Sequence, residues 1–481
     1  MSEMKDYPVT LNDDASSSVP FPDRMTGVLL YSTETPGLDG VLKKSPEDFV
    51  VEEISEIKTG DSGKYLITEL RKTNWDTHHF LKAFSKILGI SYKRIGLAGT
   101  KDKRAVTTQK MSIYDVDASD VENIHMKDIE VRVLGRARNG INLGDLEGNR
   151  FEIIVRDIRM SQEEAEKCAA ETTEAIRKAG GVPNFFGIQR FGSTRPVTHL
   201  VGKDIISGDI KKAAMRYISE IWPDEAEETC RARAYVAETG DLKGAFQRFP
   251  DYLGHEKAML NHLSADPDDA AGAFMTLPKN LCMMFVHAEQ SYMFNKIISE
   301  RLRSGLKLNE AVQGDIVCYR AKDGTPDPSR LERVTEENID GINNLLRRRR
   351  AFVTAPLIGY ESAFAEGPMG EIERRILDEC GHVPDDFRIP SFPEVASKGM
   401  RKEILLEVDP AVEVFPDDSE GSEGKTAMRL TFSLPKGSYA TTVLREYMKT
   451  DPRNMRSGKN RIRNQKSDMK SIIGYETNNR V

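Results

Sequence analysis

The chain has 481 residues, of which 39% are hydrophobic and 30% charged, and it carries a net charge of −7 at pH 7. This length predicts two or three domains, and no apolar run is long enough to cross a membrane. The net negative charge taken alone argues against a nucleic-acid partner, so the distribution of the basic residues matters more than their sum.

The cysteine pattern argues against a fold held together by disulfides or by a structural zinc ion. The five cysteines are widely spaced and none belongs to a CxxC pair, so the sequence predicts neither a disulfide framework nor a structural zinc site. We therefore expect a reducing, cytoplasmic setting. The cysteines are Cys168, Cys230, Cys282, Cys318 and Cys380.

The N-terminal residues 1–25 are predicted to form a disordered tail, because they carry early acids and lack the apolar core of a secretory signal. Order is expected to begin near Thr26, and short strands dominate from there to about residue 160. The apolar patterns predict strands at residues 48–54, 65–72, 128–136 and 150–158.

Two helices are indicated in the same region. One is predicted to begin near Thr77, with a single apolar face. The second is predicted to begin at the Ser161–Glu164 capping box, to run to about Lys178 and to stop at the glycine pair that follows. The apolar face of the first helix consists of Phe80, Leu81, Phe84, Ile87 and Leu88.

After residue 200 the composition becomes helical and acidic, with a long helical stretch at residues 281–303. A strand pattern returns at residues 429–434. The segment 409–424 before it holds six acids, no bases and two prolines, which predicts a solvated loop or linker. Strands at both ends of the chain predict an α+β catalytic domain interrupted by a helical insertion.

Basic residues gather in three places despite the negative net charge. Residues 93–110 hold six Lys or Arg and one acid, the last 42 residues hold ten Lys or Arg and four acids, and residues 347–350 are four arginines. These clusters could form the contact surface for a polyanion. Ordinary solvated faces of a highly charged protein are the alternative.

The one acid of the first cluster, Asp102, lies in a loop that reads GLAGTKDKRAVTTQ from Gly96 to Gln109. The flanking cations favour an ionised carboxylate, which suits attack on an electrophilic sugar carbon. Judged on local features alone, an ordinary loop aspartate is the commoner explanation. The loop is not a Walker A sequence, no GxSxG or HExxH motif occurs, and the adjacent His78 and His79 would make a poor metal pair.

The segment GTKDKRAVTTQ resembles the signature of the TruD family of tRNA pseudouridine synthases, in which the aspartate is the catalytic nucleophile and corresponds to Asp102. Four further segments resemble family elements in the same order, so the resemblance spans residues 43–445. These segments are KKSPEDFVVEE from Lys43, GNRF from Gly148, NFFGIQRFG from Asn184 and LPKGSYATTVLR from Leu434. The chain departs from the family pattern at Phe185, where a tyrosine is usual, and at Ile358, where a proline is.

The resemblance implies a pseudouridine synthase catalytic domain with a mixed sheet, interrupted by an inserted α/β TRUD domain. The implied domain bounds are 26–192 and 401–481 for the two parts of the catalytic domain, and 193–400 for the insertion. The implied reaction converts a tRNA uridine, usually number 13 in the D-arm, to pseudouridine without a cofactor. We expect a monomer whose partner is tRNA and which does not bind membranes.

The resemblance also implies the residues of the site. Asp102 is expected to be catalytic, Lys43 or Lys101 to hold it ionised, Asn149 to bond the flipped uracil and Phe151 to stack on it. The remaining candidates for substrate binding are supported by the resemblance alone. They are Asn184, Phe186, Gln189 and Arg190.

Three alternatives remain at this stage. The chain could be a catalytically inactive RNA-binding or chaperone protein built on a synthase, although the intact Asp102 and GNRF argue against that. It could be a synthase for a different RNA uridine. A metal-dependent nuclease is a distant third, since it would need a cluster of carboxylates around a divalent ion.

Overall fold

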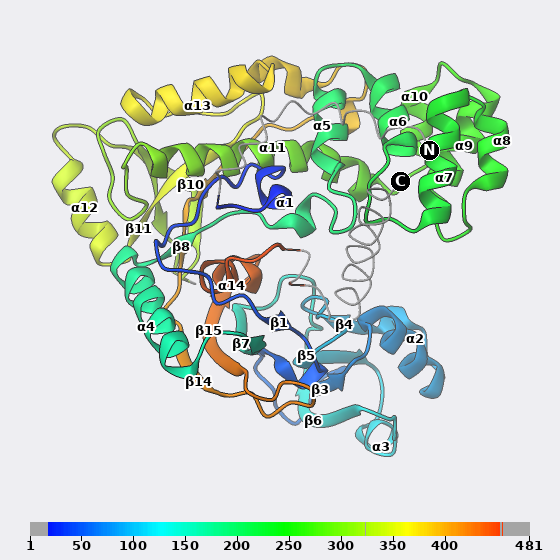
Figure 1. Ribbon diagram of the computed structural model, residues 1–481. Helices are drawn as coiled ribbons and strands as arrows, with labels where there is room; N and C mark the ends of the chain where they lie inside the picture. The colour runs from blue at the N-terminus through cyan, green and yellow to red at the C-terminus, as the bar shows by residue number, and fades with distance from the viewer. Residues whose placement is uncertain (1–17, 323, 453–454, 456–481) are drawn as a thin grey trace, which may run out of the picture.

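A large mixed sheet and a second, helix-rich body form the molecule, as the computed structural model shows (Figure 1). It describes residues 18–322, 324–452 and 455. The combination of a mixed sheet with separate helices confirms the predicted α+β class. The basic cluster predicted for the end of the chain lies largely outside the described residues.

Among the described residues, the large sheet has nine strands, which come from both ends of the chain. Its strand order is β14-β15-β7-β2-β5-β3-β6, with β1 paired to β7 and β4 paired to β5. The pair β2 and β5 is parallel and the other described pairs are antiparallel, so the sheet is mixed. The strands are β1 (Val41–Leu42), β2 (Phe49–Ile54), β3 (Tyr65–Thr73), β4 (Ile95–Leu97), β5 (Val106–Tyr114), β6 (Ile129–Ala137), β7 (Gly148–Ile158), β14 (Ala411–Pro416) and β15 (Thr426–Pro435).

The second body combines a four-stranded sheet with most of the helices (Figure 1). The strand order is β10-β9-β11-β12, and the bounds are β9 (Ile316–Arg320), β10 (Pro326–Arg333), β11 (Ala351–Leu357) and β12 (Met400–Glu403). Its helices are α5 (Thr198–Ile206), α6 (Ile210–Ser219), α7 (Glu227–Thr239), α8 (Leu242–Arg248), α9 (Gly254–Ala265), α10 (Ala270–Met275), α11 (Lys279–Arg303), α12 (Ile339–Arg347) and α13 (Gly367–Cys380). In the part of the chain that the structure describes, no helix is long and apolar enough to cross a membrane.

The chain enters and leaves the second body at one place. Strand β8 (Gly181–Pro183) precedes it and pairs antiparallel with β13 (Leu405–Glu407), which follows it. This geometry is what an insertion into a continuous domain requires. The domain bounds near residues 192 and 400 stay a prediction.

The two helices predicted near the sheet are present. Helix α2 (Thr77–Ile87) is capped by Asp76, whose carboxylate accepts from the His79 N–H, and it buries Phe80 and Phe84. Ile87, which we predicted on the apolar face, is instead 56% exposed, and it is the last residue of α2.

Helix α4 (Gln162–Ala179) has the predicted capping box at both partners, Ser161 and Glu164. It ends as predicted at Gly180, whose φ of 80° places it in the left-handed region that favours glycine. Its buried side packs against β14 and β8, so the helix closes one flank of the large sheet.

The predictions of a disordered tail and of a solvated loop are both wrong where the structure describes the segment. Residues 18–25 include the short helix α1 (Phe21–Arg24), and Asp23 forms a buried ion pair with Arg445 at 2.8 Å. The segment 409–424, predicted to be a solvated loop, contributes the whole of β14 to the sheet. It also buries Asp417 against Arg156 at 2.9 Å. In both segments the stabilising partner lies hundreds of residues away in sequence.

Candidate active site

Asp102 lies on the loop between the antiparallel strands β4 and β5. Its side chain is 53% exposed, so the carboxylate is open to a ligand. The Lys43 ammonium lies 3.4 Å from Asp102 Oδ2. The structure therefore brings the two expected residues together as an ion pair at the surface of the large sheet.

Lys43 is held in place by its backbone and by an aromatic ring. Its φ of 54° is left-handed, and its carbonyl accepts from Arg104 Nε at 2.7 Å. A second bond from Arg104 reaches the carbonyl of Lys44 at 2.6 Å. The Lys43 ammonium lies 3.9 Å from the centre of the Phe49 ring, a cation–π contact. Arg104, two residues after Asp102, thus joins the two halves of the ion pair.

Lys101, our alternative partner for Asp102, is engaged elsewhere. Its ammonium lies 2.8 Å from Glu53 Oε2, and both side chains are almost fully buried. The other carboxylate oxygen of Glu53 accepts from the Lys110 N–H at 3.2 Å. The pair therefore anchors the Asp102 loop to β2 and β5. Lys43 is the lysine, of these two, whose ammonium forms an ion pair with the Asp102 carboxylate.

Sequence reasoning missed Lys72, a buried lysine at the end of β3. Its ammonium donates to the carbonyl of Asp102 at 2.9 Å and to that of Trp75 at 2.7 Å. Glu53 was also missed as a site residue. The sequence gives one signal for Lys72: it follows the apolar Leu70 at a spacing of two and so continues the buried face of the strand. A charged side chain on a buried face needs a hydrogen-bonding or charged partner.

Asn149 and Phe151 lie on β7, directly across from β2. Asn149 faces Glu53 in register, and its Oδ1 is buried without a hydrogen-bond partner in the described residues. A free buried acceptor of this kind is what a ligand N–H can satisfy. Phe151 is 6% exposed and stacks on Phe432 of β15, with ring centres 5.5 Å apart. Its role as a platform for uracil stays a prediction.

The segment from Asn184 to Arg190 contacts the second body. Asn184 donates to the Glu403 carbonyl at 3.0 Å, and the backbone of Phe186 bonds Asn295 of α11 in both directions. Arg190 Nε donates to Ser291 Oγ at 3.2 Å, and burial lowers the pKa of its guanidinium. None of these contacts involves Asp102, so the candidates in the described part of the chain form two groups. The first group lies around Asp102 on the large sheet, and the second group is the segment from Asn184 to Arg190 against the second body.

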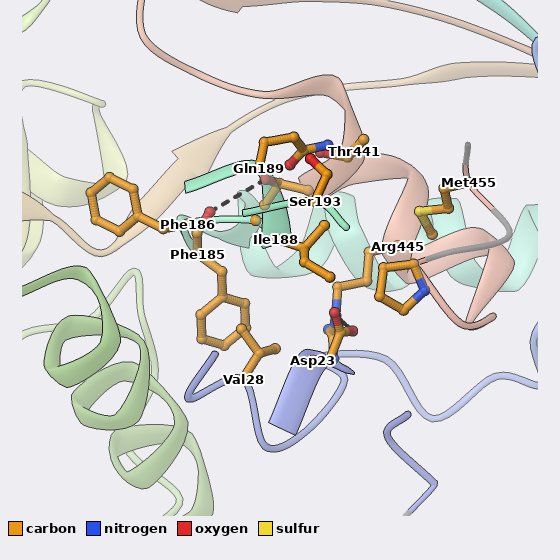
Figure 2. A pocket seen from close by; sticks show the side chains of 13 residues that line it. Asp23, Val28, Phe185, Phe186, Ile188, Gln189, Ser193, Thr441, Arg445 and Met455 are labelled. Atoms are coloured by element: carbon orange, nitrogen blue, oxygen red, sulfur yellow. Dashed lines mark hydrogen bonds and ion pairs between the residues drawn. The ribbon is translucent and has the colours of Figure 1, made fainter. Parts of the chain in front are cut away.

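A small cavity of about 70 Å³ lies beside this segment (Figure 2). Phe186 and Gln189 line it together with Thr441 of helix α14 (Ala440–Met448). The buried pair Asp23 and Arg445 forms another part of its wall, and burial raises the pKa of Asp23. The chain segment between β15 and α14 connects this cavity to the sheet that carries Asn149 and Phe151.

The chemistry available at the first group is that of an exposed carboxylate paired with a cation, with an unsatisfied amide oxygen on β7 of the same sheet. Such a carboxylate can act as a nucleophile or as a base. Within residues 18–322, 324–452 and 455, no group of three or more His, Cys, Asp or Glu residues is placed to hold a metal ion.

Comparisons with known proteins agree over nearly the whole chain. A family model described as tRNA pseudouridine synthase D (TruD) matches residues 25–447. A "Probable tRNA pseudouridine synthase D" of Methanosarcina barkeri is 54% identical over 437 residues, covering 91% of this chain and 99% of the relative. One of Halobacterium salinarum is 42% identical over 444 residues, covering 89% and 98%. The crystal structure of the "Putative tRNA pseudouridine synthase D (TruD)" of Methanosarcina mazei has a TM-score of 0.86 at 54% identity, covering 91% and 100%.

Proposed function

The chain belongs to the TruD family of tRNA pseudouridine synthases, and we propose that it converts uridine 13 in the D-arm of tRNA to pseudouridine with Asp102 as nucleophile. One observation carries the choice of residue. Asp102 is an exposed carboxylate on the family's signature loop, and a fixed lysine ammonium lies 3.4 Å from it.

The reaction is an isomerisation in which the N1–C1′ bond of uridine breaks and a C5–C1′ bond forms. Asp102 either attacks C1′ to give a ribosyl ester or removes a C2′ proton to give a glycal. The detached uracil then turns within the site and rejoins C1′ through C5. This step displaces the Asp102 carboxylate from C1′ in the first route, and the proton returns to C2′ in the second. The C5 proton then leaves to solvent, and N1 takes up a proton. The atoms of the substrate balance without a redox partner or a phosphate donor, so the proposal includes no cofactor.

The remaining residues of the first group have roles in binding. A uridine in folded tRNA must be flipped out of its stack to reach Asp102. The buried, unsatisfied Asn149 Oδ1 is suited to accept from an N–H of uracil, and Phe151 supplies an aromatic face. Exclusion of water by the bound RNA protects the intermediate from hydrolysis.

The second group is assigned to the RNA around the target. Gln189 is exposed at the cavity of Figure 2, and Arg190 lies half-buried beside it with its charge over the Phe186 ring, 5.6 Å from the centre. An arginine held this way can contact a phosphate. Asn184 is assigned a supporting role, since its amide holds Glu403. We further propose a monomer that acts in the cytoplasm.

The test is release of tritium from tRNA labelled at C5 of uridine, followed by mapping of the modified position. Wild type should release tritium in the presence of a chelator, and Asp102→Asn should release none. The matched control is Asp251→Asn, which removes a fully exposed carboxylate that pairs with Lys257 in the second body. It should behave as wild type.

Each other outcome points to a different conclusion. No release by wild type on several folded tRNAs would refute a tRNA synthase and favour an RNA-binding protein without catalysis. Release from a uridine other than 13 would leave the chemistry standing and correct the target. Retained activity in Asp102→Asn would exclude that residue as nucleophile.

A further inference from the structure

Lys72 is a charged side chain at a buried position of the sheet, where an apolar side chain would be expected. It is fully buried, and it shares a face of β3 with Leu70, two residues before it, which belongs to the core under α2. Its neighbours in the sheet are uncharged, Thr107 on β5 and Ile129 on β6. Burial of an ammonium is unfavourable unless hydrogen bonds replace its lost hydration, so the contacts of the Lys72 ammonium indicate what it stabilises.

Those contacts converge on the backbone of the Asp102 loop. The ammonium donates to the Asp102 carbonyl at 2.9 Å and to the Trp75 carbonyl at 2.7 Å. Thr77, the first residue of α2, exchanges hydrogen bonds with the backbone of Lys101 at 3.2 and 3.3 Å. The start of α2, the end of β3 and the loop are thus joined at one point, and Lys72 is the charge at that point.

We propose that Lys72 is a positioning residue for Asp102: by holding the backbone carbonyl of the nucleophile itself, it fixes where the carboxylate stands relative to the sugar. This inference rests on the proposed function of Asp102. The Asp102 side chain is half exposed and forms an ion pair with Lys43, so its position depends strongly on its own backbone. A misplacement of about 1 Å at a reacting group can lower the rate about 100-fold.

The charge of Lys72 gives this role a pH signature. Burial lowers the pKa of its ammonium to about 8, and Lys101 adds to that effect, while the carboxylates of Asp102 and Asp76 oppose it. Loss of the proton replaces charge-assisted hydrogen bonds by weaker neutral ones. The hold on the loop, and with it kcat, should therefore weaken as the pH rises through about 8.

The test compares Lys72→Met with Lys449→Met in the tritium-release assay, with kcat and KM measured separately. Lys449 is a matched control, because it also donates to two backbone carbonyls, those of Thr33 and Thr35, at the end of α14. In Lys72→Met we expect kcat to fall about 100-fold and the alkaline decline near pH 8 to disappear. KM for tRNA should stay within about threefold of wild type, since binding contacts remain. Lys449→Met should keep the wild-type kcat and pH profile.

The outcomes separate this inference from the proposed function. A folded Lys72→Met with wild-type kcat, beside an inactive Asp102→Asn, overturns the role of Lys72 alone. If Asp102→Asn is active, Asp102 is not the nucleophile, and both the proposed function of Asp102 and the role of Lys72 are overturned. If Lys72→Met does not fold, the wild-type profile decides. A decline of kcat centred near pH 8 at constant KM supports the inference, and a constant kcat from about pH 7 to 9 overturns it.

Discussion

Replacement of Arg156 by methionine should destabilise the fold by about 3 kcal/mol, because it leaves two buried carboxylates without their cation. Arg156 Nε lies 2.6 Å from Asp48 Oδ1, and its Nη1 lies 2.9 Å from Asp417 Oδ1. Both carboxylates are almost fully buried. Methionine keeps the apolar stem of the side chain and removes only the charge and its hydrogen bonds.

The size of the effect can be worked from Asp417. Burial raises the pKa of this carboxyl, but hydrogen bonds from the Asp157 N–H, Ser419 and Arg156 outweigh it and lower the pKa to about 2. A drop from the ordinary 3.8 to about 2 corresponds to about 2 kcal/mol of stability at neutral pH. Arg156 supplies part of this stability through Asp417, and its ion pair with Asp48 adds a further part. The expected loss in the free energy of unfolding is therefore near the lower end of the range for a broken buried ion pair.

The pH dependence has a definite sign. A depressed carboxyl pKa stabilises the fold fully above its unfolded value of 3.8, and that stability is lost as the pH falls toward about 2. Urea unfolding followed by circular dichroism should therefore show a large gap between wild type and Arg156→Met at about pH 7, and a smaller gap at about pH 3. Equal midpoints at pH 7, or a gap that does not narrow in acid, would refute this reasoning.

The matched control is Arg429→Met on the neighbouring strand β15. Arg429 also contacts two carboxylates, those of Glu152 and Glu413, but all three side chains are more than one-third exposed. Exposed ion pairs contribute less than about 1 kcal/mol, so this variant should unfold close to wild type. If both arginine variants lose the same stability, burial is not the reason for the effect.

Two further changes concern the loop and its cation. Lys43→Met should lower kcat at least about tenfold with tRNA binding unchanged, because Asp102 loses its nearby cation, whereas Lys44→Met should spare kcat. Lys44 points away to Asp157, and an equal loss in both variants would contradict a specific role for Lys43. Glu53→Gln should cost about 3 kcal/mol by leaving the Lys101 ammonium buried and unpaired. An unchanged melting temperature would contradict that.

The parts of the fold that local patterns determine were predicted well. Strands predicted at residues 48–54 and 150–158 correspond to Phe49–Ile54 and Gly148–Ile158, and the helix after Ser161 ends at Gly180. These features depend on periodicity and on capping residues within a few positions of each other. Local patterns also predict the helix that begins at Thr77, although they place Ile87 on its buried face and the structure exposes that side chain.

What could not be predicted depends on contacts between distant segments. The composition of residues 409–424 indicates a segment exposed to solvent, yet Asp417 is buried. Its partner is Arg156, which lies 261 residues earlier in the chain, beyond the reach of any local pattern. Asp23 is ordered for the same reason, by Arg445. In the site, resemblance pointed to Asp102 and Lys43. The roles of Glu53 and Lys72 appear only when β2, β3 and β5 are seen side by side.

The pairing of β7 with β15 has a consequence for synthesis of the protein. β7 has partners on both sides, and the one that supplies Phe432 against Phe151 is separated from it by more than half the chain. A ribosome must therefore finish the second body before it delivers that partner. During the interval the apolar edge of β7, with Ile153 and Val155, is open to other strands. The nascent chain should depend on chaperones during this period and fold slowly compared with its helical part.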